Sequence, residues 1–150
     1  MGLAVEPLEI AEPIAPTKNR AVERLRLDIL YVALGAIVGA LMRYFVTSEA
    51  LFVEGLPVSV LIINLIGSFI LGLTMAGVAR LGFSSGIVLL IGVGFCGSLT
   101  TMSSFAYETV NLIDAAKLGL VFLNIVLNVG LSILAVVAGQ AVINAIAGLL

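Results

Sequence analysis

The segment 92–108, GVGFCGSLTTMSSFAYE, decides how the rest of this chain must fold. It places three glycines and then five serine and threonine hydroxyls inside a run, 81–107, that has no charged residue. Glycine disfavours a helix by about 1 kcal/mol relative to alanine, and serine and threonine hydroxyls can bond to nearby backbone groups instead. We therefore expect one long apolar helix that is broken near 97–100.

The runs around this segment have the length and polarity of membrane spans. The chain of 150 residues is 61% hydrophobic and 11% charged, and its mean hydropathy is +1.26, whereas soluble domains are about 45–50% apolar. No charge interrupts 55–79 or 118–150, and only Arg43 interrupts 29–47. A spanning helix needs about 20 mostly apolar residues. The sequence predicts an all-α integral membrane protein whose third helix is broken mid-membrane.

We expect a disordered or interfacial tail, residues 1–26, followed by one four-helix transmembrane domain, residues 27–150. The spans are predicted at about 27–47, 57–79, 84–110 and 117–149. Short connections make neighbouring spans antiparallel, which puts both termini on one side of the membrane. The positive-inside rule then favours a cytoplasmic N-terminus. The cations on that side are Lys18, Arg20, Arg24, Arg26 and Arg80.

Composition excludes several classes of function. The net charge of -2 and the pI near 4.9 give no basic field that would attract nucleic acid. With no histidine and one cysteine, a single chain offers neither a typical zinc site nor a disulfide. Four spans leave no room for a conventional enzyme.

Three asparagines lie well inside the predicted spans, away from their ends. Asn64 is surrounded by aliphatic residues in the second span, and Asn124 and Asn128 lie one helical turn apart in the fourth. Carboxamide N–H groups can donate to an anion, but an isolated asparagine more often forms an interhelical hydrogen bond. Together with the hydroxyl cluster, and without a carboxylate near the helix centres, these amides favour an anion over a cation.

Other residues of the spans have structural interpretations. Gly35 and Gly39 form a GxxxG pair that lets helices approach closely. Arg43 lies near the end of its span, where it can reach the headgroups or a partner inside the protein. Non-helical backbone at membrane depth must be buried or line a cavity, and the carbonyls that it frees are candidate cation ligands.

Three motifs resemble the Fluc, or CrcB, family of fluoride channels: GAIVGALMRY at 35–44, NLIGSF at 64–69, and the segment 94–108. The resemblance implies an antiparallel, dual-topology homodimer in the cell membrane that exports fluoride through two pores. It also implies a structural sodium ion at the dimer centre, held by the backbone carbonyls of Gly97 and Thr100.

The resemblance implies a fluoride pathway along the third span and its neighbours. In it Asn64 lines each pore, Phe105 is one of a pair of pore phenylalanines, and Glu108 lies in a vestibule. The remaining polar positions that it implies are Ser103, Ser104, Asn124 and Asn128.

Two positions depart from the family pattern. Met102 stands where the first pore phenylalanine is expected, and Ser59-Val60 precedes Asn64 where the family has Gly-Thr. Methionine has no aromatic quadrupole, although it is flexible and polarizable. Either change predicts lower throughput, another coordination route, or a subunit that pairs with a different chain.

Two other functions remain open from the sequence. A proton-coupled exporter of the small multidrug type is also four-helical and dimeric, but it needs an ionisable carboxylate well inside a central helix. Here Glu108 lies near the far end of the third span. The second alternative is a membrane assembly subunit that conducts no ion, for which Met102 would mark a lost function.

Overall fold

The computed structural model describes residues 18–49 and 51–149, so most of the predicted tail lies outside the described residues. Within this part of the chain, four helical stretches are long and apolar enough to cross a membrane. They are Arg20–Ser48, Ser59–Leu81, Ser85–Asp114 and Leu118–Ala147. The prediction of an all-α, four-span protein is confirmed.

Helix α1 (Lys18–Ser48) contains the first span, predicted at about 27–47, and also 20–26, which the sequence predicts as the interfacial start of the same helix. Its first turns are rich in Arg, Glu, Leu and Ala, which are strong helix formers, so the helix continues beyond the apolar run. Helix α2 (Ser59–Leu81) begins two residues after the expected position, because Pro57 belongs to the connection that precedes it.

That connection forms a short hairpin, where the sequence predicted only a loop. Strand β1 (Phe52–Val53) pairs with β2 (Leu56–Pro57) in antiparallel register. The two turn residues, Glu54 and Gly55, have φ values of 52° and 84°, as expected for a tight hairpin turn whose central residues are left-handed.

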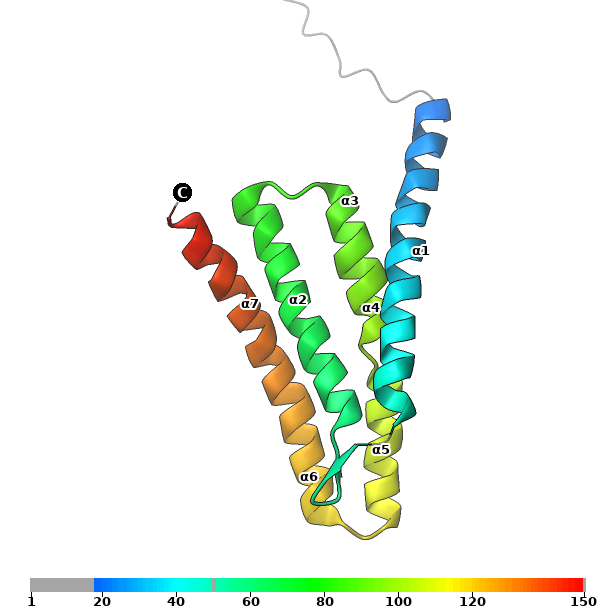
Figure 1. The fold of residues 1–150 in the computed structure, drawn as a ribbon, viewed down its shortest axis with the longest axis vertical. Coiled ribbons are helices and arrows are strands. Elements are labelled where there is room, and N and C mark those ends of the chain that lie inside the picture. Colours follow the sequence, from blue (N-terminus) through cyan, green and yellow to red (C-terminus); the bar gives the residue numbers. More distant parts are fainter. Residues whose placement is uncertain (1–17, 50, 150) are drawn as a thin grey trace, which may run out of the picture.

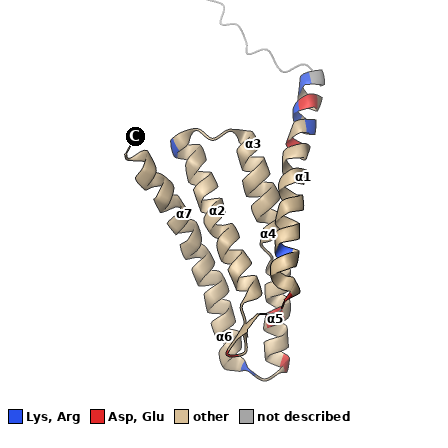
Figure 2. Cartoon of the chain, viewed as in Figure 1, with Lys and Arg blue, Asp and Glu red and all other residues tan. Residues whose placement is uncertain are grey.

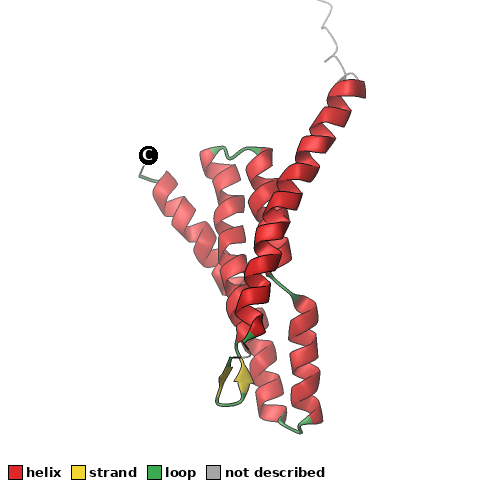
Figure 3. Ribbon diagram, turned by 45° about the vertical axis from the view of Figure 1, so that its right-hand side comes forward, coloured by secondary structure: helices red, strands yellow, loops and turns green. Residues whose placement is uncertain are grey.

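The third span is broken, as predicted. Thr100 and Thr101 have extended backbones, with φ/ψ of -76°/153° and -150°/117°, and Figure 3 shows the gap between the two helical parts. The Thr101 hydroxyl accepts a hydrogen bond from the Ser104 N–H at 3.1 Å and so caps the helix that follows. The pieces in chain order are α3 (Ser85–Ile87), the π-helical segment η1 (Val88–Cys96), α4 (Gly97–Leu99) and α5 (Met102–Asp114).

The fourth span contains α6 (Leu118–Val126), the π-helical segment η2 (Leu127–Leu131) and α7 (Ser132–Ala147). It packs along α2, while α1 packs against η1 and α4 (Figure 1). Small residues make these contacts close: a Cβ on Gly35 or Gly39 would collide with backbone atoms of Leu90 or Phe95.

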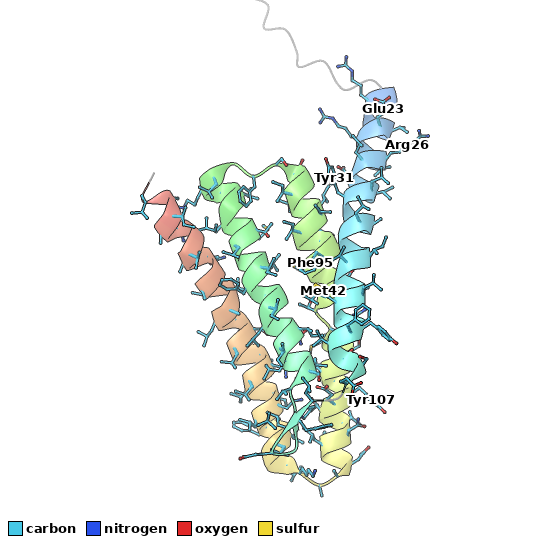
Figure 4. All side chains as sticks on the ribbon, in the orientation of Figure 1. Glu23, Arg26, Tyr31, Met42, Phe95 and Tyr107 are labelled. Atoms are coloured by element: carbon cyan, nitrogen blue, oxygen red, sulfur yellow. The ribbon has the colours of Figure 1, made fainter. Side chains whose placement is uncertain are left out.

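The outer surface is apolar and the charges lie toward the ends. Large side chains such as Leu34 and Phe122 are 57% and 70% exposed, which suits a lipid-facing surface. Figure 1 places the start of α1 and the end of α7 on the same side, and Figure 2 shows Lys and Arg at the ends of α1 and α2 on that side. In Figure 4, Tyr31 lies beside α3, where its ring packs against Gly86.

Candidate functional site at the helix break

Asn64 of α2 bridges the break in the third span. Its Oδ1 accepts a hydrogen bond from the backbone N–H of Thr101 at 2.9 Å, and its Nδ2 lies 3.4 Å from the Thr101 carbonyl oxygen. In a continuous helix that N–H would bond to the carbonyl four residues earlier. Asn64 therefore forms the interhelical hydrogen bond expected of an isolated asparagine, and it satisfies a backbone donor that the break sets free.

The polar contacts continue from Asn64 across the bundle. Asn64 Nδ2 donates to Asn128 Oδ1 at 3.2 Å, and Asn128 Nδ2 donates to Asn124 Oδ1 at 2.9 Å and to its backbone oxygen at 3.2 Å. Asn124 Nδ2 donates to the Thr109 hydroxyl at 3.0 Å, and that hydroxyl donates to the Phe105 carbonyl at 2.7 Å. We call Asn64, Asn128, Asn124 and Thr109 the amide relay.

The break also releases two carbonyls that the sequence predicted as cation ligands. The Thr101 N–H, the normal helical partner of the Gly97 carbonyl, donates to Asn64 instead. The Ser104 N–H, the normal partner of the Thr100 carbonyl, donates to the Thr101 hydroxyl. Both carbonyl oxygens therefore lose the hydrogen bond that a continuous helix would give them.

A cavity of about 440 Å³ opens beside the break. We call it the central cavity. Its lining is mainly apolar, with carboxamides and hydroxyls but no charged side chain. The predicted residues that line it are Asn64, Gly97, Thr100, Met102, Phe105 and Asn128.

Phe105 and Met102 differ sharply in exposure, although both reach this cavity. Phe105 is 7% exposed, whereas Met102 is 71% exposed on the outer surface of the chain. The two residues lie three positions apart on α5, but the helix turns only one of them into the interior. In a single chain, Phe105 is therefore the enclosed aromatic group of the cavity.

A second cavity of about 600 Å³ lies between α5 and the β1–β2 hairpin, and we call it the outer cavity. It holds the predicted residues Ser103, Ser104 and Glu108 and also Lys117. Glu108 Oε2 is buried and has no hydrogen-bond partner among the described residues. The Thr101 hydroxyl lies 3.0 Å and 3.1 Å from the hydroxyls of Ser103 and Ser104. A continuous set of hydroxyls thus connects the two cavities.

Residues 30–140 match the family described as CrcB-like protein, Camphor Resistance (CrcB). This chain belongs to the CrcB family. With its four apolar helices it is a multi-pass membrane protein.

Similar proteins include several named fluoride-specific ion channel FluC. One from Shewanella halifaxensis is 38% identical over 118 residues, which cover 77% of this chain and 95% of the relative. One from Methanocaldococcus jannaschii is 41% identical over 102 residues, covering 68% and 82%. One from Nitrosopumilus maritimus is 41% identical over 120 residues, covering 80% and 95%.

The CrcB match contains every predicted site residue, but the structure does not bring them all to the cavities. Asn124 is 1% exposed and lines neither cavity. Arg43, half-buried on α1, lines neither cavity, and Gly35 and Gly39 lie at the contact of α1 with η1 and α4.

The structural roles of two polar residues of this CrcB chain were missed by the sequence analysis, which counted Thr101 only as one hydroxyl of a cluster. Thr101 is 6% exposed and is the point at which Asn64 meets the break. A threonine three residues before Ser104 could have been recognised as a helix cap. Thr109 closes the amide relay, and a single threonine near a helix end gives no comparable signal in sequence.

Proposed function

We propose that this CrcB-family chain is a passive, fluoride-selective channel through which cytoplasmic fluoride leaves the cell, and that it is not an enzyme. The observation that carries the proposal is the Asn64 carboxamide at an uncharged cavity that the buried Phe105 also lines. The relatives named as fluoride-specific ion channels support the choice of ion.

The residues of the central cavity suit a small anion that must also leave. Carboxamide N–H groups donate hydrogen bonds, and the edge of a phenylalanine ring carries positive potential. Both attract fluoride without the deep binding that a fixed cation would impose, and conduction needs binding that is weak enough for release. The hydroxyls of Ser103 and Ser104 continue this path toward the outer cavity.

Passive conduction is sufficient for export. Hydrogen fluoride enters a cell as a neutral molecule and dissociates in the less acidic cytoplasm, so the trapped anion leaves down its own gradient. A proton-coupled exporter needs an ionisable carboxylate in the middle of its path. The lining of the central cavity has none, which favours a channel over an exporter.

We further propose that the working unit is an antiparallel homodimer in the cell membrane with two pores. Met102 and Gly97 lie exposed beside the polar break, and polar backbone facing lipid is costly. A second copy would cover it. Labelling of a cysteine placed in the hairpin turn should occur from both sides of the membrane. Labelling from one side only would refute the dual topology, and co-purification with a different subunit would favour a heteromer.

A sodium ion fits the break as a structural cofactor. The carbonyl oxygens of Gly97 and Thr100, which lack their helical partners, would hold it with the same atoms of a second copy. Neutral oxygen ligands suit a hard monovalent cation. The ion would neutralise converging carbonyl dipoles at the dimer centre and would not travel with fluoride.

Efflux from liposomes tests the function. Purified protein should release fluoride from loaded vesicles, with chloride retained, and without a proton gradient. Efflux that requires a proton gradient would establish the exporter instead. Absence of any efflux from well-folded protein would favour the assembly subunit.

A further inference from the structure

The donors and acceptors of the amide relay can be oriented in only one way. A backbone N–H can only donate, so the Asn64 atom that faces Thr101 N at 2.9 Å must be its oxygen. The Asn64 nitrogen then faces Asn128, and the Asn128 atom that accepts its hydrogen bond must be Oδ1. The usual ambiguity between the oxygen and the nitrogen of an asparagine amide is therefore removed by one backbone group.

A second backbone group gives the same answer independently. The Asn124 carbonyl can only accept, so the Asn128 atom at 3.2 Å from it must be nitrogen. Asn124 then accepts through Oδ1 and donates through Nδ2 to Thr109. The Thr109 hydroxyl accepts this hydrogen bond and donates its own hydrogen bond to the Phe105 carbonyl. The Thr101 N–H at one end and the Asn124 carbonyl at the other therefore require the same direction of hydrogen bonding along the relay.

This direction of hydrogen bonding decides which amides of the relay have an N–H group free to donate to an anion. Both N–H contacts of Asn128 go to Asn124, so Asn128 has an oxygen and no free donor toward the cavity. Asn64 is different: its contact to the Thr101 carbonyl is 3.4 Å, beyond the usual 2.7–3.2 Å range. The loosely held donor of the relay is therefore the second N–H of Asn64.

We propose that Asn128, Asn124 and Thr109 are positioning residues, and that Thr109 anchors a relay that holds one N–H of Asn64 in place and leaves the second N–H for the ion. The inference rests on the proposed function in taking fluoride as that ion. Without the Thr109 hydroxyl, the Asn124 amide is left without an acceptor at 1% exposure, where water does not reach. The Asn124 amide then rotates, and Asn128 Nδ2 loses the Asn124 Oδ1 that it donates to. Asn128 Oδ1 is no longer held in place as the acceptor for Asn64 Nδ2, although the Thr101 N–H still holds the Asn64 oxygen.

The chain contains a matched control for Thr109. Thr74 in α2 is 3% exposed, and its hydroxyl also donates to the carbonyl four residues earlier, at 2.8 Å. It differs in having no role in the amide relay. Thr109→Val and Thr74→Val therefore remove the same group and the same local hydrogen bond, and only the first breaks the relay.

The experiment measures fluoride efflux from liposomes that contain the full-length protein. Thr109→Val should lower efflux about threefold to tenfold, the effect of losing one positioning hydrogen bond, whereas Thr74→Val should leave it unchanged. Thr109→Ser keeps the hydroxyl and should restore most of the efflux. If Thr109→Val conducts as well as Thr74→Val, the proposal is wrong. If neither Thr109→Val nor Thr109→Ala folds while Thr109→Ser does, the hydroxyl has only a folding role and the proposal also fails.

A double-mutant cycle tests whether Thr109 affects efflux through Asn124. In an Asn124→Leu background, Thr109→Val should add little further loss of efflux, because the relay is already cut. The shifts in thermal unfolding temperature should be non-additive in the same way, and this readout does not depend on fluoride. Additive shifts in both would overturn the relay. Absence of efflux from the unchanged protein would refute the proposed function, while the unfolding cycle would still decide on the relay.

Discussion

Replacement of Asn64 by aspartate is the most direct test of the ion path. The two side chains have the same shape, and the carboxylate still accepts the Thr101 N–H that Asn64 accepts at 2.9 Å. The change removes both Nδ2 contacts, to Asn128 Oδ1 and to the Thr101 carbonyl. It also places a negative charge beside the central cavity.

The size of the effect depends on how close fluoride passes. For two unit charges 4 Å apart at an effective dielectric constant near 20, the repulsion is about 4 kcal/mol, which corresponds to roughly a thousandfold in rate. At a separation of 10 Å the same expression gives about 1.7 kcal/mol, or roughly twentyfold. We therefore expect Asn64→Asp to reduce fluoride efflux by about three orders of magnitude.

Asn144→Asp is the matched control. It makes the same chemical change at the exposed end of α7, where Asn144 Oδ1 accepts from Arg80 Nε at 3.0 Å, and surface charge pairs have small effects. Efflux from liposomes at neutral pH, with elution profiles as a folding check, should separate the two variants clearly. A well-folded Asn64→Asp channel within about twofold of the Asn144→Asp control, far below the repulsion expected at short range, would refute a fluoride path past Asn64.

Three further predictions follow from the same geometry. Phe105→Ile should reduce efflux strongly by removing the ring edge, whereas the same change at Phe122, which is 70% exposed, should not. Unchanged efflux from Phe105→Ile would remove the aromatic contact from the mechanism. Met102→Phe should leave efflux equal or raise it. Replacing sodium by a large organic cation should lower the thermal stability of the proposed dimer, and an unchanged unfolding temperature would contradict the proposed sodium site. Gly39→Ala should destabilise the protein by about 1–3 kcal/mol through overpacking against η1 and α4. Gly119→Ala adds a methyl group that meets nothing within 4 Å outside its own helix backbone, so it should be neutral or slightly stabilising in the same unfolding assay.

The sequence alone determined the class of protein and the position of the break. Hydropathy is a local property, so runs such as 55–79 and 118–150 identify spans without any knowledge of their neighbours. The break at Thr100 and Thr101 is local as well, because it depends on the helix preferences of nearby glycines and hydroxyls. The family resemblance, carried by short motifs, was confirmed by the match over 30–140.

The tertiary structure alone decided what each polar group does. Asn64 meets Thr101 across 37 positions of the sequence and Asn128 across 64, and no local pattern relates residues so far apart. The helical phase of α5 turns Phe105 inward and Met102 outward, although both occur in the same motif. Hydrogen-bond direction is also a tertiary property: Asn64 and Asn128 have identical side chains, but only their partners decide which of them has a donor to offer an anion.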